Sequence, residues 1–553
     1  MVSNPTIEKK KSRKIEITIL IALLALGLLP RLVFLFRGPY TIIRILPDDC
    51  FYYLKTSQYI AAGVGSTFDG LHLTNGYHPL WMLIMTPLAF FLHNPLALLK
   101  TALGLSILAS LLSTLVLYKL LKKLTHIWWI PLFGCSLYFF NAQAMANSMD
   151  VLGTAVSTLL FISALYLTIS QLITKDKAKG YILLLGIVLG LLFLARTDNV
   201  FYIITFFLLA IARRERGARL RSGLTLAGII AVICGPWFIW SWVRFGSLMQ
   251  SQGLALPFLR QQTYLLSGKN YLQMFLYGLW YFFGFLFKGI PHDLGFSNSF
   301  IPAAIFALCL LIIGFRWRDP ELEQTQLIHN SIKVTLLLYL GGLCLIFSHT
   351  FWRWFPRIWY FDQLIILSAF FLGLALVVLD SKRVLPRLVH FFYPQAETAN
   401  IFLRTAMAVV MIALLFLPLL RGSERLIKGD YFWQAEMLDA AYWLKNNSKK
   451  DETAAAFNAG IISFFSERRV VNLDGAINNA AYAALKRKDL LNLIYQSGVD
   501  YYLDYDPAML SWYAPFLGKM KERVKMSLVK EFDRPEGTWC SSHLKIYRLD
   551  WLK

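Results

Sequence analysis

Residues 9–36 read KKKSRKIEITILIALLALGLLPRLVFLF, a basic segment followed by an apolar run of about twenty residues. A helix of that length crosses the roughly 30 Å hydrocarbon core of a bilayer. The run is too long for the apolar part of a signal peptide and lacks a small-residue cleavage site, so we interpret it as a retained first membrane span. The lysines and arginines ahead of it indicate a cytoplasmic N-terminus.

The whole chain has the same apolar character. Of its 553 residues, 57% are hydrophobic and 16% are charged, and the mean hydropathy is +0.52. Soluble domains carry about 25% charged residues, so a soluble enzyme and a disordered chain are excluded. The six cysteines show no CxxC spacing, which argues against a disulfide framework or a zinc ribbon. The composition therefore predicts a polytopic α-helical membrane protein.

Eleven apolar runs are expected to span the membrane. They lie at 16–36, 96–118, 127–146, 152–173, 180–195, 199–211, 222–243, 299–315, 331–348, 358–379 and 400–420. An apolar segment around 271–289 could raise the number to 12 or 13. With a cytoplasmic N-terminus, the inner segments carry 21 Lys and Arg in 61 residues, and the outer segments carry 10 in 114. This follows the positive-inside rule, so the net charge of +22 indicates orientation rather than nucleic-acid binding.

The region from 421 to 553 differs from the rest, because it has no spanning run and holds 20 Lys and Arg against 17 Asp and Glu. Strands are expected at 453–458, 468–473 and 499–505, and helices at 435–447, 460–466 and 480–498. This alternation predicts a small exoplasmic α/β domain with a partly parallel sheet, following a membrane domain over 1–420. The chain has no Walker loop or GxGxxG motif, which argues against a nucleotide-driven transporter.

The first exoplasmic loop, 37–79, contributes most of the polar stretch LPDDCFYYLKTSQYIAAGVGSTFDGLHLTNGYHPLW at 46–81. Asp48 and Asp49 are expected at the membrane face, ahead of an amphipathic helix at about 50–62. Carboxylates near lipid are costly unless they bind a ligand, pair or react. The alternative is that one of them caps the following helix. His78 near the end of the stretch is a candidate, although a lone histidine is more often structural.

Three further polar groups are expected at the same face. They are Asp150 in NSMDVLG, Arg196 and Asp198 in ARTDN, and His349, Arg353 and Arg357 in HTFWRWFPRIWY. The simpler alternatives are, in turn, a helix cap, a local ion pair, and an aromatic belt with snorkelling arginines. Lys269 and Lys288 could be plain solvated charges. Taken together, the groups predict an outward-facing polar site at the lipid boundary.

Transfer of a sugar from a polyprenyl-phosphate carrier would use such a mixture of groups. A carboxylate acts as general base on an acceptor hydroxyl, which attacks the anomeric carbon. Negative charge grows on the departing phosphate, so arginine, lysine or a metal ion must stabilise it. The donor is already activated, so the reaction needs no ATP site.

Several segments resemble one enzyme family in order along the chain. PDDCFYYL at 47–54 is similar to the acidic motif that opens the first outer loop of GT-C glycosyltransferases, the polyprenyl-phosphate-sugar enzymes that include protein O-mannosyltransferases and lipid A aminoarabinose transferases. GSTFDGLHLTNGYHPLW resembles a bacterial subgroup of these enzymes. The other similar segments are MDVLGTAV, LLFLARTDN, FGSLM and NAGIISFFSERRVVNLDGAINN. The sequence has no WWD motif, which argues against en bloc oligosaccharide transfer to asparagine.

The resemblance implies roles for the candidate residues. Asp48 or Asp49 would be the base or a metal ligand, and Asp150, where many relatives have Glu, would orient the acceptor or complete a metal site. A divalent cation, Mg or Mn, could thus be held by Asp49 and Asp150. The residues expected to bind the donor phosphate or the substrate are Arg196, Asp198, Arg353, Arg357, His78, Tyr53, Tyr77 and His349. A single base with direct displacement would invert the anomeric centre. Asp474 in the LDG segment is interpreted as part of a strand-ending turn.

The expected partners are a polyprenyl-phosphate-linked sugar donor, a glycan, lipid or protein acceptor, and membrane lipids, but no nucleic acid. The expected location is the cytoplasmic membrane of a prokaryote. A secondary transporter or flippase for a lipid-linked or anionic substrate is the alternative. Transporters usually carry charge at the bilayer midplane and internal repeats, neither of which is evident here. A non-catalytic envelope scaffold is a third possibility, and the first-loop acids argue against it.

Overall fold

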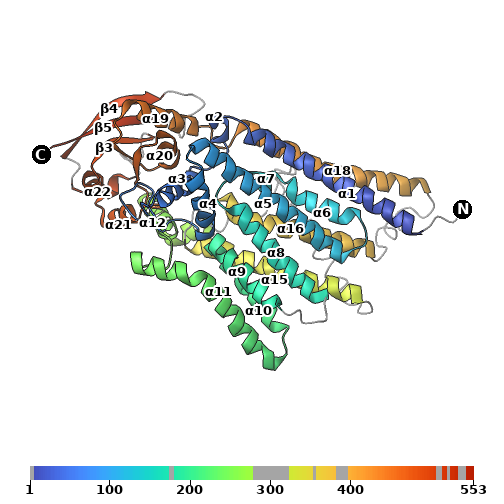
Figure 1. Ribbon diagram of the computed structural model, residues 1–553. Helices are drawn as coiled ribbons and strands as arrows, with labels where there is room; N and C mark the ends of the chain where they lie inside the picture. Colours follow the sequence, from blue (N-terminus) through green and yellow to red (C-terminus); the bar gives the residue numbers. More distant parts are fainter. Residues whose placement is uncertain are drawn as a thin grey trace.

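The computed structural model describes residues 5–173, 180–277, 323–352, 357–381, 397–505, 513–519, 523–532 and 543–552. A long helical bundle forms most of the molecule, and a domain containing a β-sheet sits at one end of it (Figure 1). The basic N-terminal segment lies at the opposite end of the bundle. The two ends of the bundle therefore differ in charge and in architecture.

Six helices in the described residues contain segments long and apolar enough to cross a membrane. They are α1 (Pro5–Leu35), α5 (Pro95–Leu124), α8 (Thr154–Ile173), α11 (Arg216–Phe245), α15 (Glu323–Phe351) and α16 (Asp362–Ser381). Shorter apolar helices are α4 (Pro79–Phe91), α6 (Trp129–Phe139), α9 (Tyr181–Ala195) and α10 (Val200–Ala212). The predicted run at 299–315 lies outside the described residues, and the segment at 271–289 is described only to 277. The polytopic helical class is confirmed.

One predicted span is interrupted. The run at 127–146 forms α6 and then α7 (Ala142–Asn147), because the side chain of Asn141 accepts a hydrogen bond from the backbone N–H of Ala144 at 2.9 Å and starts a new helix. The last apolar run lies within α18 (Glu397–Lys428), which packs beside α7. α18 continues past the predicted domain boundary at residue 420.

The first loop forms α2 (Pro39–Ile42) and α3 (Asp49–Ala61), so the helix predicted at about 50–62 is confirmed. α3 packs between α4 and α20 of the C-terminal domain. The apolar helix α4 had not been assigned from sequence. It begins at Pro79, a position where proline loses no helical hydrogen bond. It returns the chain toward α5 after placing Trp81 in the protein interior.

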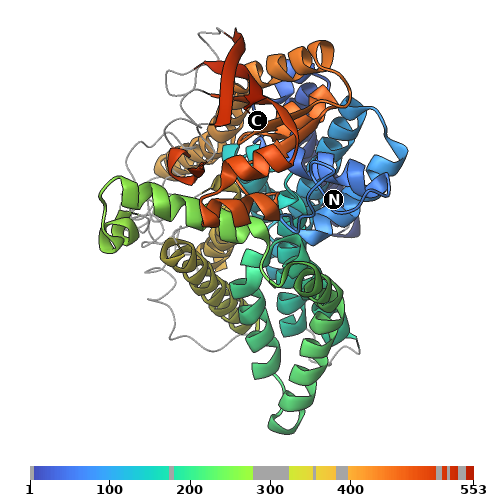
Figure 2. The same cartoon turned by 90° about the vertical axis from the view of Figure 1, so that its left-hand side faces the viewer.

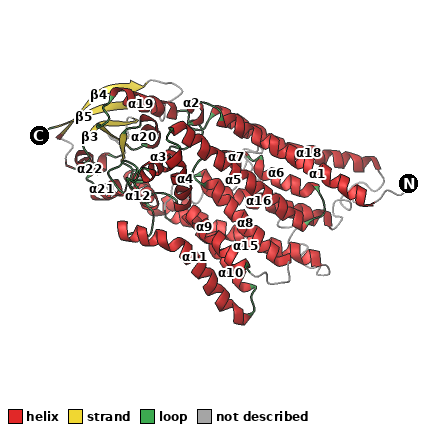
Figure 3. Cartoon of the chain, in the orientation of Figure 1, coloured by secondary structure: helices red, strands yellow, loops and turns green. Residues whose placement is uncertain are grey.

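The C-terminal region forms a small α/β domain, as expected (Figure 3). Its sheet has five strands, of which the sequence predicted three. Its elements are α19 (Gln434–Asn447), β1 (Thr453–Ala456), α20 (Gly460–Ser466), β2 (Arg469–Asn472), α21 (Asn479–Arg487), α22 (Leu490–Gln496), β3 (Val499–Tyr505), β4 (Val524–Phe532) and β5 (Leu544–Trp551). The strand order is β2-β1-β3-β5-β4, with β1 parallel to β2 and β3. β5 runs antiparallel to both of its neighbours. The prediction of a partly parallel sheet is confirmed.

The prediction of a single helix at 480–498 is wrong. The chain forms α21 and α22 instead, because Lys488 adopts a left-handed conformation with φ of 56° and ends the first helix. α12 (Ser251–Leu266), which follows α11 in the chain, lies beside α21 and connects the bundle to this part of the domain (Figure 2).

Alternate residues of the strands face two different hydrophobic layers, as the two-residue period of a strand requires. Ala454 and Ala456 belong to a hydrophobic core that continues into the helical bundle, whereas Ala455 belongs to a separate core under α21 and α22. One face of the sheet is therefore part of the same packed interior as the bundle, which fixes the domain over the first loop.

Candidate functional site

The two adjacent first-loop acids have different environments. The carboxylate of Asp48 accepts hydrogen bonds from the backbone N–H groups of Gly460 at 3.0 Å and Ile461 at 2.7 Å. Asp48 makes no side-chain cap on α3, so the expected alternative is wrong for this residue, which instead caps α20 of the C-terminal domain. Burial raises the pKa of Asp48 to about 7, and the two backbone hydrogen bonds oppose this shift. Asp48 thus joins the loop to the domain.

Asp49 has no such partner. Within the described part of the chain, its carboxylate accepts no hydrogen bond. Burial raises the pKa of Asp49, and the charge of Arg357 partly lowers it. The structure therefore leaves Asp49 as an uncommitted carboxylate within electrostatic range of a guanidinium group.

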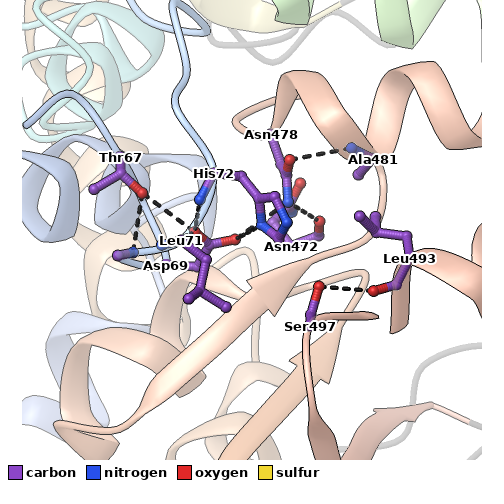
Figure 4. A network of polar contacts seen from close by, with 10 residues as sticks. Thr67, Asp69, Leu71, His72, Asn472, Asn478, Ala481, Leu493 and Ser497 are labelled. Carbon is purple, nitrogen blue, oxygen red and sulfur yellow. Dashed lines mark hydrogen bonds and ion pairs between the residues drawn. The ribbon is translucent and has the colours of Figure 1, made fainter. Parts of the chain in front are cut away.

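The TFDG segment of the first loop is held by Asp69 (Figure 4). One carboxylate oxygen of Asp69 accepts hydrogen bonds from the backbone N–H groups of Leu71 and His72, both at 2.8 Å. The other oxygen lies 2.9 Å from Nδ1 of His72 and accepts a bond from Nδ2 of Asn478 at 3.3 Å. Asp69 therefore stabilises the turn and ties it to the C-terminal domain.

The TNG segment forms a second connection to the domain. The side-chain oxygen of Asn75 accepts hydrogen bonds from the backbone N–H of Ser251 and from Nδ2 of Asn479, both at 3.0 Å. The next residue, Gly76, packs so closely that an added methyl group would overlap the carbonyl oxygen of Ala476. The segments that resemble the bacterial subgroup therefore contact one another across the domain interface.

Asp150 lies in the connection between α7 and α8 and is 4% exposed. One carboxylate oxygen accepts a hydrogen bond from the backbone N–H of Leu152 at 2.9 Å. The other oxygen is buried and has no hydrogen-bond partner within the described residues. Burial raises the pKa of Asp150 to about 7, while Arg196 lowers it and Asp362 raises it. Asp150 therefore has a free oxygen in an interior position.

Arg196 and Asp198 form the local ion pair that was one expected alternative. Nε and one terminal nitrogen of Arg196 donate to the two carboxylate oxygens of Asp198, at 3.1 and 2.8 Å. The guanidinium group is buried and lies 5.0 Å from the ring centre of Tyr360. This bidentate geometry fixes the plane of the guanidinium group.

His78 and Tyr53 meet beside this pair. The hydroxyl of Tyr53 accepts a hydrogen bond from the backbone N–H of His78 at 3.2 Å. Burial and the charge of Arg196 lower the pKa of His78 to about 3, so its imidazole is neutral near pH 7. The charges of Arg196, Asp49 and Asp150 all act on the Tyr53 hydroxyl. Tyr53 therefore lies within electrostatic range of both predicted acids.

Other predicted residues are placed less centrally. The hydroxyl of Tyr77 lies 2.6 Å from Oγ of Ser66, and its ring packs against Trp237, so its described contacts include none of the predicted acids. Lys269 is exposed and lies over the ring of Tyr277. Arg353 and Lys288 lie outside the described residues.

His349 and Arg357 both lie against aromatic rings. The ring of His349 is 4.9 Å from that of Tyr360, and the guanidinium of Arg357 is 5.6 Å from the ring centre of Trp359. The expected aromatic surroundings are therefore present. Both residues also act on site carboxylates, since His349 lies within electrostatic range of Asp198 and Arg357 within range of Asp49.

Asp49 and Asp150 are the predicted ligands for a divalent cation. Within the described residues, no group of three or more His, Cys, Asp or Glu side chains is arranged to hold a metal ion. Mg²⁺, however, is often bound by one or two carboxylates together with substrate phosphates and water. The cation at Asp49 and Asp150 therefore stays a prediction.

Sequence reasoning missed two charged residues near the site. Arg31 in α1 and Asp362 in α16 are almost completely buried. Both stand inside apolar runs that were assigned as spans, and an ionisable residue inside a span is itself a sign of function. That signal could have identified them.

Comparisons with known proteins support the fold. Residues 86–240 match the model of the dolichyl-phosphate-mannose-protein mannosyltransferase family, and residues 427–547 match a domain family of unknown function. The crystal structure of ArnT from Cupriavidus metallidurans bound to undecaprenyl phosphate matches with a TM-score of 0.57 and 12% identity, covering 96% of this chain and 97% of that chain. The resemblance to the GT-C glycosyltransferases is confirmed.

The apo structure of the same ArnT gives a TM-score of 0.56 at 12% identity, covering 96% of this chain and 97% of that chain. At this identity the likeness establishes the GT-C fold and no shared residue roles. Among curated protein sequences, none matches this chain. The GT-C family match contains Asp150 and Arg196 and ends before the C-terminal domain. The chain is thus a multi-pass membrane protein with an ArnT-like fold.

Proposed function

We propose that this GT-C protein transfers one sugar from a polyprenyl-phosphate-linked donor to an acceptor at the exoplasmic face of a prokaryotic cytoplasmic membrane. The observation that carries the proposal is the carboxylate of Asp49, which accepts no hydrogen bond within the described residues and lies within electrostatic range of Arg357. Asp49 begins α3, which packs against α20 of the C-terminal domain. The ArnT of the same fold binds undecaprenyl phosphate, which supports the donor class.

In the proposed reaction, Asp49 removes the proton of an acceptor hydroxyl while its oxygen forms a bond to the anomeric carbon. The bond between that carbon and the phosphate oxygen breaks, and the phosphate leaves with the electron pair. Arg357, together with Arg196 and Arg353, neutralises the charge that develops on the phosphate. Because the acceptor displaces the phosphate directly, the anomeric centre is inverted.

Asp150 would orient the acceptor through its free oxygen, and His78 and Tyr53 would shape the sugar pocket. If a divalent cation takes part, Asp49 and Asp150 would hold it, and it would supply positive charge to the leaving phosphate. Full activity in the presence of EDTA would show that the transfer needs no divalent cation. Loss of activity that is restored by Mg²⁺ or Mn²⁺ would support it.

The proposal is tested with the purified full-length chain in bilayer nanodiscs. A panel of polyprenyl-phosphate sugars is supplied with glycan, lipid and protein acceptors, and the release of polyprenyl phosphate is measured. We expect release with one donor, dependent on an acceptor. Movement of an intact donor across vesicles without cleavage of the glycosidic bond would instead support a flippase.

The pH dependence follows from the buried acids. The pKa of Asp150 is raised to about 7, so its carboxylate takes up a proton as the pH falls through this range, and burial raises the pKa of Asp49 as well. We therefore expect kcat/KM to fall as the pH decreases from about 8 to about 6. The charged and titratable groups that act on Asp150 are Arg196, Asp362 and Tyr53. A flat profile over this range would contradict the required ionised carboxylates.

A further inference from the structure

Two charged residues lie inside membrane-spanning helices behind the site. Arg31 is 0% exposed and Asp362 is 1% exposed, and within the described residues neither forms an ion pair. The two opposite charges act on each other without direct contact, and buried charges that form no ion pair are costly. The hydrogen bonds of Arg31 and Asp362 show which parts of the chain these residues stabilise.

Arg31 on α1 connects three points of the bundle. Its Nε donates to Oγ of Ser148 at 2.9 Å, and its two terminal nitrogens donate to the carbonyl oxygens of Gly27 at 2.6 Å and Phe139 at 3.0 Å. The guanidinium group also lies 4.3 Å from the ring centre of Phe139. All three hydrogen bonds are buried, and the only side-chain acceptor among them is Ser148.

Asp362 on α16 binds Asn147, the residue before Ser148. Its carboxylate accepts hydrogen bonds from Nδ2 of Asn147 at 3.0 Å, from Oγ1 of Thr158 at 2.6 Å and from the hydroxyl of Tyr138 at 3.2 Å. Asn147 and Ser148 are consecutive, so the two buried charges form hydrogen bonds with adjacent residues just before Asp150.

The segment after Asn147 and Ser148 has a strained backbone. Val151 adopts φ of 55°, a left-handed conformation that is a real outlier for a β-branched residue. Its carbonyl oxygen accepts a bond from Nε1 of Trp81 at 2.7 Å. Strain of this kind costs about 1–3 kcal/mol and persists only where the surroundings determine the conformation. The connection at 147–153 is therefore held from α1, α16 and α4 together.

We propose that Arg31 and Asp362 are positioning residues, which fix the connection at 147–153 so that the free oxygen of Asp150 faces the substrate. The proposal rests on the proposed sugar transfer for its kinetic consequences. Its structural consequence, a connection locked by buried charges, is independent of that function.

Asp362→Asn tests the contacts of the second charge. An amide nitrogen cannot accept the hydrogen bonds that the carboxylate of Asp362 receives from Asn147, Thr158 and Tyr138. We expect this variant to lower kcat with the donor KM unchanged, and to accelerate amide hydrogen exchange at 147–153.

Ser148→Ala tests the hydrogen bond from Arg31, with Ser113→Ala as its matched control. Both hydroxyls are buried and donate to a carbonyl oxygen one turn back, Met145 for Ser148 and Ala109 for Ser113, but only Ser148 accepts from Arg31. We expect Ser148→Ala to lower kcat by roughly 10- to 100-fold with the donor KM unchanged. Amide hydrogen exchange at 147–153 should accelerate in the same variant, and Ser113→Ala should show neither change.

The readouts separate the two proposals. If the wild-type protein transfers no sugar, the proposed function fails, and the exchange comparison alone judges the positioning proposal. Wild-type exchange at 147–153 in Ser148→Ala, or equal acceleration in Ser113→Ala, would overturn it. Wild-type exchange at 147–153 in Asp362→Asn would also overturn it.

Discussion

Asp49→Asn is expected to reduce sugar transfer by about 10²- to 10⁴-fold, the usual contribution of a general base. An amide cannot take the proton of the acceptor hydroxyl. Because Asp49 accepts no hydrogen bond within the described residues, the substitution removes no internal hydrogen bond, and the protein should stay folded with its donor affinity retained. The measurements are kcat for the release of polyprenyl phosphate and the Kd of the donor.

Asp48→Asn is the matched control, since it makes the same chemical change one residue earlier. Asp48 is bound to Gly460 and Ile461, and an amide in its place turns one acceptor toward a backbone N–H into a donor. We expect a loss of stability of about 1–3 kcal/mol and a smaller fall in kcat. If Asp49→Asn stays active and a folded Asp48→Asn protein does not, the assignment of the base is wrong.

The sequence predicted the helical membrane class and the small α/β domain at the C-terminal end because these depend on local pattern. Apolar runs of membrane length and alternating strand and helix segments are visible within windows of about ten to twenty residues. The same local view could not separate Asp48 from Asp49. The partners of Asp48 lie 412 and 413 residues away, and only the tertiary structure brings them together.

Other differences between the predicted and the observed helices arise where a single residue starts or ends a helix, which the hydrophobic periodicity does not show. Asn141 starts a new helix inside a continuous apolar run, and Lys488 ends one inside a continuous helical pattern. Asp474 agrees with its interpretation as a turn, because its carboxylate accepts from the backbone N–H of Ala476 at 2.8 Å and Gly475 has φ of 77°. Burial raises the pKa of Asp474 to about 7, and the charge of Asp49 adds to this rise, so the turn also borders the site.

The strongest effect expected outside the site is that of Gly76→Ala. A methyl group there would overlap the carbonyl oxygen of Ala476 and meet Oγ of Ser251 at 2.6 Å. That carbonyl already accepts a bond from Ser251 at 2.9 Å, so backbone and partner must both shift. Gly76 does not have a positive φ, so the cost comes from overlap and not from backbone conformation. Overpacking of this kind costs about 1–3 kcal/mol.

The overlap lies where the first loop meets the C-terminal domain, so we expect Gly76→Ala to loosen the domain and to lower kcat along with stability. Thermal unfolding and the rate of limited proteolysis measure the first effect. Gly104→Ala in α5 is the control, because nothing lies within 4 Å of its added methyl group and alanine favours a helix. If Gly76→Ala resists protease and heat as well as Gly104→Ala does, the loop and the domain are not packed together as the structure shows. The C-terminal domain would then no longer be held against α3, the helix that begins at Asp49.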